Sequence, residues 1–230
     1  MVVDDLRFEL RRSARRKSIG VTVDRDGTLL QHAPVDCSLD AIEQVARQQQ
    51  GWIYAKLARK RALVHERPVK EYVSGEGFLY LGRSYRLLLV TPGEGQDTMP
   101  PLRLQGGRFL LRRDERDRAD AHFVAWYAAQ GGEWLGRHVR LLAAQVGVAP
   151  HGIDVRDLHH QWGLCSPEGR VAFHWRTLQL PPRIIMYIVV HELAHLLHPN
   201  HGPEFWRCIA RVLPDWAARA QWLEEHGARY

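Results

Sequence analysis

His191-Glu192-Leu193-Ala194-His195, with His201 six residues further on, is the part of this sequence from which chemistry follows most directly. Two histidines four residues apart on a helix are separated by one turn, so both imidazoles project from the same face and can bind one cation. Glu192 points to a neighbouring face, close enough to take a proton from a metal-bound water without being a ligand. Three neutral histidines with an open fourth position predict a catalytic zinc site.

The residues before His191 predict that this helix is buried, because almost all of them are apolar: Ile184, Ile185, Ile188, Val189 and Val190. Two histidines and a glutamate on a buried helix would carry a desolvation cost unless they were paired or bound to a metal. The apolar surroundings therefore favour a real metal site over a chance match of five residues.

The third histidine lies beyond the expected end of the helix at Pro199, so a loop can bring His201 back to the other two. A zinc ion in this site would lower the pKa of its bound water to about 7, and Glu192 would take that proton as a general base. The second ring nitrogens of His191 and His195 need acceptors. Glu204, Asp215 and backbone carbonyls are the candidates.

The rest of the sequence predicts an α+β fold in two regions, which are also able to pack as one domain. Residues 1–113 form a β-rich amino-terminal region with one long helix, which begins after the N-cap Ser38 and ends near Arg61. Alternating residues and a turn at Asp26-Gly27 predict an antiparallel pair of strands. The expected strands of this region lie near 17–23, 28–33, 78–81, 85–90, 102–104 and 109–112.

Residues 114–230 form a mainly helical catalytic region with a short sheet. Two helices, near 119–130 and 133–146, are interrupted at Gly131-Gly132, where the sequence predicts a kink or a boundary. Short strands near 153–157 and 171–175 follow. The metal-binding helix then begins at Pro181 or Pro182, and two helices close the chain.

The net charge of +6 is unevenly distributed. The first 118 residues hold 22 Lys and Arg against 16 Asp and Glu, whereas the remaining residues hold ten of each. The densest group, here called the amino-terminal basic cluster, consists of Arg11, Arg12, Arg15, Arg16 and Lys17. Such a cluster can bind nucleic acid, but a run of charge on a strand edge is more often simply solvated, and we favour the solvated interpretation.

Cysteine spacing and hydropathy predict a cytoplasmic protein without a membrane partner. Cys37, Cys165 and Cys208 are far apart and form no C-x-x-C pair, which argues against a disulfide framework and for a reducing compartment. No apolar signal segment follows Met1. The longest apolar stretch, 184–190, is too short to span a bilayer.

The stretch from Gln161 to Trp206 resembles the YgjP-like metallopeptidases, relatives of the WLM and SprT-like zincins. The matching residues are Trp162-Gly163, Cys165-Ser166, Trp175-Arg176, Pro181-Pro182, Val189 to Leu193, His195, Pro199-Asn200-His201 and Glu204-Phe205-Trp206. Similar residues in the amino-terminal half are Arg15 to Ile19, Ala33-Pro34, Trp52-Ile53, Tyr80-Leu81-Gly82 and Tyr85. The resemblance implies a zincin-like catalytic region in which the three histidines bind Zn²⁺ and Glu192 is the catalytic acid and base.

This sequence departs from the family at Gln161, Leu164 and His174, where relatives usually have Arg, Ser and Asn. Gln161 and His174 are therefore possible substrate-cleft residues, and His160, which falls on a predicted edge near the site, is a third, although most histidines are simply surface or hydrogen-bonded core residues. The histidine spacing also fits metzincins, but His198 stands where they have glycine. No methionine follows His201, which excludes a Met-turn beneath the site.

The leading hypothesis is thus a zinc-dependent metallopeptidase with a peptide or protein substrate. A metal-dependent hydrolase of a nucleotide or other phosphorylated small molecule uses the same chemistry and is the first alternative. The second is a nucleic-acid-associated protease, recruited by the basic amino-terminal half. A purely structural zinc site is disfavoured, because it would leave Glu192 without a role.

Overall fold

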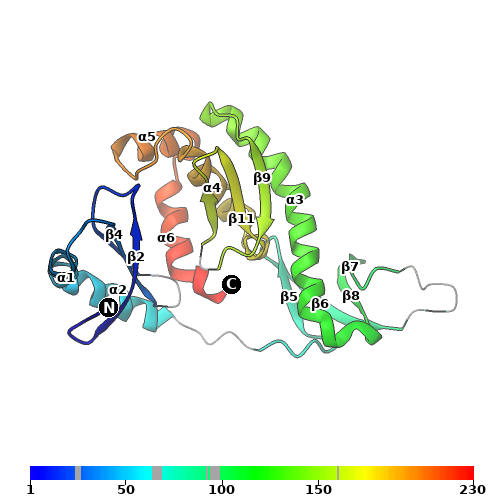
Figure 1. The fold of residues 1–230 in the computed structure, drawn as a ribbon. Coiled ribbons are helices and arrows are strands. Elements are labelled where there is room, and N and C mark those ends of the chain that lie inside the picture. The colour runs from blue at the N-terminus through cyan, green and yellow to red at the C-terminus, as the bar shows by residue number, and fades with distance from the viewer. Residues whose placement is uncertain (24–26, 64–68, 92, 94–98, 160) are drawn as a thin grey trace. The chain divides into compact units, whose positions relative to one another are not determined.

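The computed structural model describes residues 1–23, 27–63, 69–91, 93, 99–159 and 161–230 (Figure 1). The chain divides into two compact units, Met1–Glu66 and Arg67–Ala228. Together their sheets and helices form an α+β fold, as the sequence predicts. Among the described residues, no helix combines the length and the apolar character that crossing a membrane requires.

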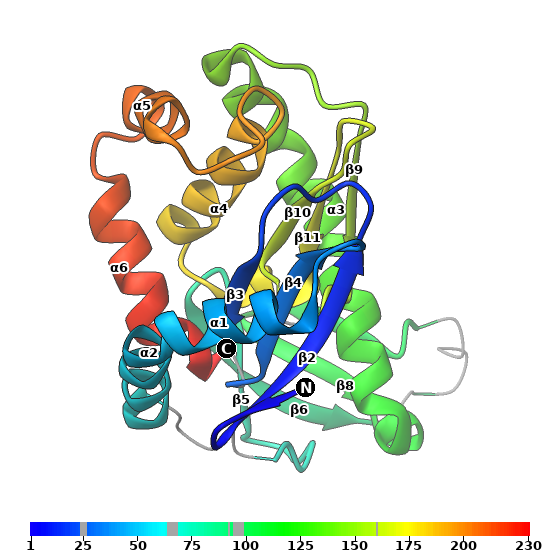
Figure 2. The same ribbon diagram turned by 60° about the vertical axis from the view of Figure 1, so that its left-hand side comes forward.

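The first unit consists of a four-stranded sheet and two helices (Figure 2). Its strands, in the order β1-β2-β4-β3, are β1 (Val2–Val3), β2 (Leu6–Ser13), β4 (Leu29–Pro34) and β3 (Gly20–Val23). β2 and β4 are parallel, and β3 and β4 are antiparallel, so the predicted antiparallel pair is confirmed. Asp26 of the expected Asp26-Gly27 turn lies outside the described residues.

Two helices, α1 (Leu39–Gln48) and α2 (Gln50–Leu63), stand where the sequence predicted one long helix, so that prediction was wrong. Ser38 is the N-cap of α1 as expected, and its hydroxyl accepts a hydrogen bond from the Ala41 amide. The division falls at Gln49, close to Gly51, whose conformational freedom weakens a helix. Ala46 and Ile53, one from each helix, pack on the apolar face of the sheet with Phe8.

The second unit begins with another four-stranded sheet, in the order β5-β6-β8-β7. Its strands are β5 (Gly77–Tyr80), β6 (Arg83–Val90), β8 (Arg108–Arg112) and β7 (Leu102–Gln105), close to the expected positions. Aromatic rings join this sheet to helix α3 (Ala119–Val146): Phe78 stacks on Phe123 at 4.1 Å, and Phe109 meets Trp126 at 4.8 Å. The boundary expected between residues 113 and 114 therefore falls inside this unit.

Helix α3 is continuous through Gly131-Gly132, so of the two predicted alternatives, a kink or a boundary, the boundary does not occur. It follows the 3-10 helix η1 (Arg113–Arg118). A Cβ on Gly131 would lie 3.0 Å from both Leu178 and Val155, whereas one on Gly132 would have no neighbour within 4 Å. Gly131 thus permits close packing of α3 on the strand below it, which outweighs the low helix propensity of glycine.

A three-stranded sheet with the order β10-β11-β9 carries the carboxy-terminal half of this unit. Its strands are β9 (Gly152–Arg156), β10 (Gly163–Cys165) and β11 (Arg170–His174); β11 is parallel to β9 and antiparallel to β10. The sequence did not predict β10, which has only three residues. Gly163, Phe173 and Val155 lie opposite one another and therefore share one face of the sheet.

The remaining helices follow this sheet: η2 (Trp175–Gln179), α4 (Pro182–Ala194), α5 (Pro203–Val212), α6 (Trp216–His226) and η3 (Gly227–Arg229). The turn between β5 and β6 holds the start of α4 in place. The Leu81 amide donates to the Leu178 carbonyl at 2.7 Å, and the Gly82 amide donates to the Gln179 carbonyl at 3.1 Å. Gly82 has a φ of +75°, and a Cβ there would lie 2.9 Å from the Pro181 Cα.

Candidate metal centre

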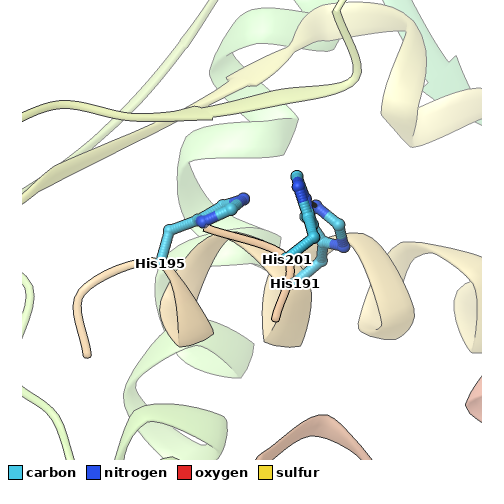
Figure 3. A group of neighbouring side chains, drawn as sticks. All are labelled: His191, His195 and His201. Carbon is cyan, nitrogen blue, oxygen red and sulfur yellow. Dashed lines mark hydrogen bonds between the residues drawn. The ribbon is translucent and has the colours of Figure 1, made fainter. Parts of the chain in front are cut away.

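Three histidines converge at the end of α4 (Figure 3). His191 lies in the last turn of the helix, His195 caps it, and His201 comes from the loop before α5. One nitrogen of each imidazole lies within 4.8 Å of the others. The structure therefore brings together the three residues that the sequence predicted as metal ligands.

The spacing of the ring nitrogens suits a shared metal. The Nε2 atoms of His191 and His201 are 3.1 Å apart. Two nitrogen ligands at about 2.0–2.1 Å from a tetrahedral metal lie about 3.3 Å from each other. A metal ion between these two atoms would need little rearrangement of either ring.

The electrostatics of the site keep the imidazoles neutral. Burial, with contributions from His195 and His201, lowers the pKa of His191 to about 3. Burial also lowers the pKa of His195 and of His201, although the His201 side chain is exposed. Neutral imidazoles offer the lone pairs that a metal requires, so the donor set fits a divalent cation.

The second ring nitrogens differ in their surroundings. His195 Nδ1 lies 3.2 Å from the His198 carbonyl, which agrees with the predicted backbone acceptor. His191 Nδ1 is buried without a hydrogen-bond partner among the described residues. Glu204 and Asp215, the predicted carboxylate acceptors, instead pair with arginines of their own helices, Arg207 and Arg219.

Glu192, the residue next to His191 in the sequence, has a buried carboxyl group. The residue is only 7% exposed, and burial raises its pKa to about 8. A Cβ on Gly163 would lie 2.5 Å from the Glu192 Cγ and 2.7 Å from its Oε1. The glutamate side chain thus occupies space that only glycine leaves free on β10.

Sequence reasoning missed two aromatic neighbours of the histidines. The Tyr187 ring approaches His191 edge-on at 5.9 Å, and burial raises the pKa of Tyr187 to about 12. The fully buried Phe205 lies beneath the imidazoles. Four-residue spacing is the available signal for Tyr187, which precedes His191 by one helical turn. His201 lies in the loop before α5, so no helical spacing connects it with Phe205.

The three possible substrate-cleft residues lie in different environments. His174 is 2% exposed; its Nδ1 accepts from the Arg176 amide, and its Nε2 lies 3.5 Å from Asp157. It follows Phe173 in β11 and so points to the sheet face opposite Gly163. Gln161 is exposed just before β10, and His160 lies outside the described residues. A contact of any of them with substrate stays a prediction.

Known proteins that are similar to this chain include one family and one solved structure. The profile of a family described as "YgjP-like, metallopeptidase domain" matches residues 17–226. The chain is also similar to the solved metallopeptidase zymogen of Pyrococcus abyssi abylysin, with 25% identity, a TM-score of 0.34, and 36% of this chain and 84% of that chain covered. No curated protein sequence matches this chain.

Proposed function

This chain belongs to the YgjP-like metallopeptidase family, and we propose that it is a zinc-dependent peptidase. His191, His195 and His201 would hold the metal, and Glu192 would act as the general base. The observation that carries the proposal is the convergence of three imidazoles, with nitrogens within 4.8 Å of one another, at the end of a helix in which a buried glutamate follows His191.

Zinc is the metal we propose because the donor set consists of imidazole nitrogens. Calcium and magnesium prefer oxygen ligands, whereas three histidines with an open position are typical of catalytic zinc. Zinc bound by these three histidines would supply Lewis acidity at the site.

Glu192 is the proposed proton acceptor. Burial disfavours its charged form, but a nearby divalent cation favours a carboxylate, so metal loading prepares this residue to accept a proton. Gly163 leaves its carboxyl group room to lie against β10. This room against β10 supports a role for Glu192 as a base rather than as a ligand.

A peptide is the proposed substrate, and β10 supports this choice beside the family assignment. It is an edge strand of the described three-stranded sheet, and an extended peptide can join such an edge through main-chain hydrogen bonds. Because Gly163 of β10 touches Glu192, a peptide aligned on this strand would pass the catalytic glutamate.

The three cysteines bear on the proposed cytoplasmic location. Cys37, Cys165 and Cys208 are all free thiols, which is compatible with a reducing compartment.

Metal content and turnover test the proposal separately. The purified protein is expected to carry about one equivalent of zinc, and His191→Ala, His195→Ala and His201→Ala should each lose most of it. His198→Ala is the matched control, because it removes an imidazole from the same loop but keeps the carbonyl that His195 contacts. Full zinc occupancy in His201→Ala would contradict the ligand assignment.

Glu192→Gln should retain zinc while turnover falls at least ~100-fold, the usual scale for losing a general base. Turnover is measured on fluorescein-labelled casein, short peptides and nucleotides, with and without a chelator. Undiminished activity of zinc-loaded Glu192→Gln would defeat the mechanism. Chelator-sensitive hydrolysis of nucleotides alone would favour the phosphorylated-substrate alternative.

A further inference from the structure

Phe205 contacts all three histidines of the candidate metal centre. The Phe205 ring is 0% exposed, and its centroid lies 4.9 Å from that of His191, 4.6 Å from His195 and 4.7 Å from His201. It meets His191 and His201 nearly edge-on, at 79° and 76°, and His195 at 35°. One side chain thus touches two ligands from a helix and one from a loop.

Helix α5 fixes Phe205 independently of any metal. Phe205 lies in its first turn and shares its buried face with Cys208 and Ile209, which belong to the same core cluster. The next residue, Trp206, stacks on Trp216 at 4.4 Å. Its indole nitrogen donates to the His201 carbonyl at 3.1 Å, which ties the loop to the helix.

Hydrogen bonds alone do not fix the orientation of all three histidine rings, so packing against a neighbouring side chain such as Phe205 is needed as well. A metal-binding histidine is ordinarily oriented by an acceptor for its second ring nitrogen. His191 Nδ1 has no such acceptor among the described residues, so ring packing must set its orientation. Phenylalanine suits the role, because it offers no competing ligand atom and excludes water beneath the rings.

We propose that Phe205 is a positioning residue, an apolar support that holds the three imidazoles in ligand geometry before a metal binds. The sequence has no methionine after His201 that could fill this place. This inference rests on the proposed metal site. It adds that part of the metal affinity comes from a side chain that touches the ligands but never the metal.

The test compares Phe205→Leu with Phe109→Leu. Both remove a fully buried phenylalanine ring, but Phe109 lies in β8 among the aromatic rings that pack on α3. Zinc affinity is measured by competition with a chelator, and ligand geometry by the visible absorption spectrum of the cobalt-substituted protein. Phe205→Leu should bind zinc about 10- to 100-fold more weakly, with an altered cobalt spectrum. Phe109→Leu should lose thermal stability but keep both properties.

Phe205→Met is the milder variant, since its flexible thioether fills much of the same volume without a flat ring. We expect zinc affinity between those of the wild type and Phe205→Leu, so the inference can be judged even if Phe205→Leu does not fold. Wild-type affinity and spectrum in the variants that fold would overturn it, as would an equal loss in Phe109→Leu. A wild-type protein that binds no zinc would instead refute the proposed function, and this inference with it.

Discussion

Gly163→Ala is expected to impair turnover without removing the metal. A methyl group at this position would lie 2.5 Å from the Glu192 Cγ, 2.7 Å from its Cδ and 2.7 Å from its Oε1. Ordinary contacts of a Cβ atom are 3.4–4 Å long, so either the carboxyl group or strand β10 must move.

The size of the effect follows from this displacement. Extending the shortest contact to an ordinary length requires a movement of about 1 Å, and a misplacement of about 1 Å in a catalytic group can cost about 100-fold in rate. We therefore expect kcat/KM to fall about 100-fold, which corresponds to about 2.7 kcal/mol of transition-state stabilisation. Zinc content should be unchanged, because Gly163 does not belong to the histidine cluster.

The assay follows hydrolysis of labelled casein and measures zinc in the same samples. Gly132→Ala is the matched control, since a methyl group there meets nothing within 4 Å and alanine favours the helix by roughly 0.5–1 kcal/mol. If Gly163 acts only through Glu192, adding Gly163→Ala to Glu192→Gln should cost no further activity. Near-wild-type turnover of zinc-loaded Gly163→Ala, or full additivity in the double variant, would refute the reasoning.

Three further changes test other parts of the structure. Gly131→Ala should lower the free energy of unfolding, measured in urea, by about 1–3 kcal/mol, because its methyl group would lie 3.0 Å from Val155 and Leu178. Gly132→Ala should instead raise the free energy of unfolding. In a second variant, the amino-terminal basic cluster is changed to serine except at Arg12, which donates to the Val35 and Cys37 carbonyls. We expect DNA binding of the wild type to be weak and salt-dependent, and this variant to change it little. Sub-micromolar binding by the wild type at physiological salt that is lost in the variant would favour the nucleic-acid-associated protease. Burial and the nearby charge of Glu192 raise the pKa of the Cys165 thiol. Iodoacetamide should therefore label Cys165 more slowly in the folded than in the unfolded protein at pH 8, and labelling should accelerate as the pH rises. Equal labelling rates of the folded and unfolded protein, measured by mass spectrometry, would contradict this burial.

Local patterns in the sequence predicted most of the fold. Alternating and apolar runs located β3 and β4 of the first sheet and all four strands of the second, and Ser38 marked the start of α1 correctly, but β1 and β2 were not predicted. Strand β10 was not predicted because three residues are too few to show an alternating pattern of apolar and polar side chains. The continuity of α3 depends on packing that Gly131 makes possible with Val155, a residue far along the chain.

The sequence likewise predicted one part of the candidate site and not another. The spacing of His191, His195 and His201 predicted their convergence, because one helical turn and one loop are local geometry. Gly163 and Glu192 lie in different elements, β10 and α4, so no local sequence pattern indicated that they pack against each other. Among the candidate acceptors the sequence could not choose; in the structure Glu204 pairs with Arg207, three residues away on the same helix.

The hydrogen bonds from the Leu81–Gly82 turn to η2 bear on how quickly a metal could leave. They secure the residues immediately before α4, so the helix cannot easily slide or rotate, and His191 and His195 keep their spacing. The exposed His201 belongs to a loop, so among the three proposed ligands it should have the most freedom to detach. We expect zinc release to an excess of chelator to begin there, at a rate that changes more with the sequence of residues 196–202 than with that of α4.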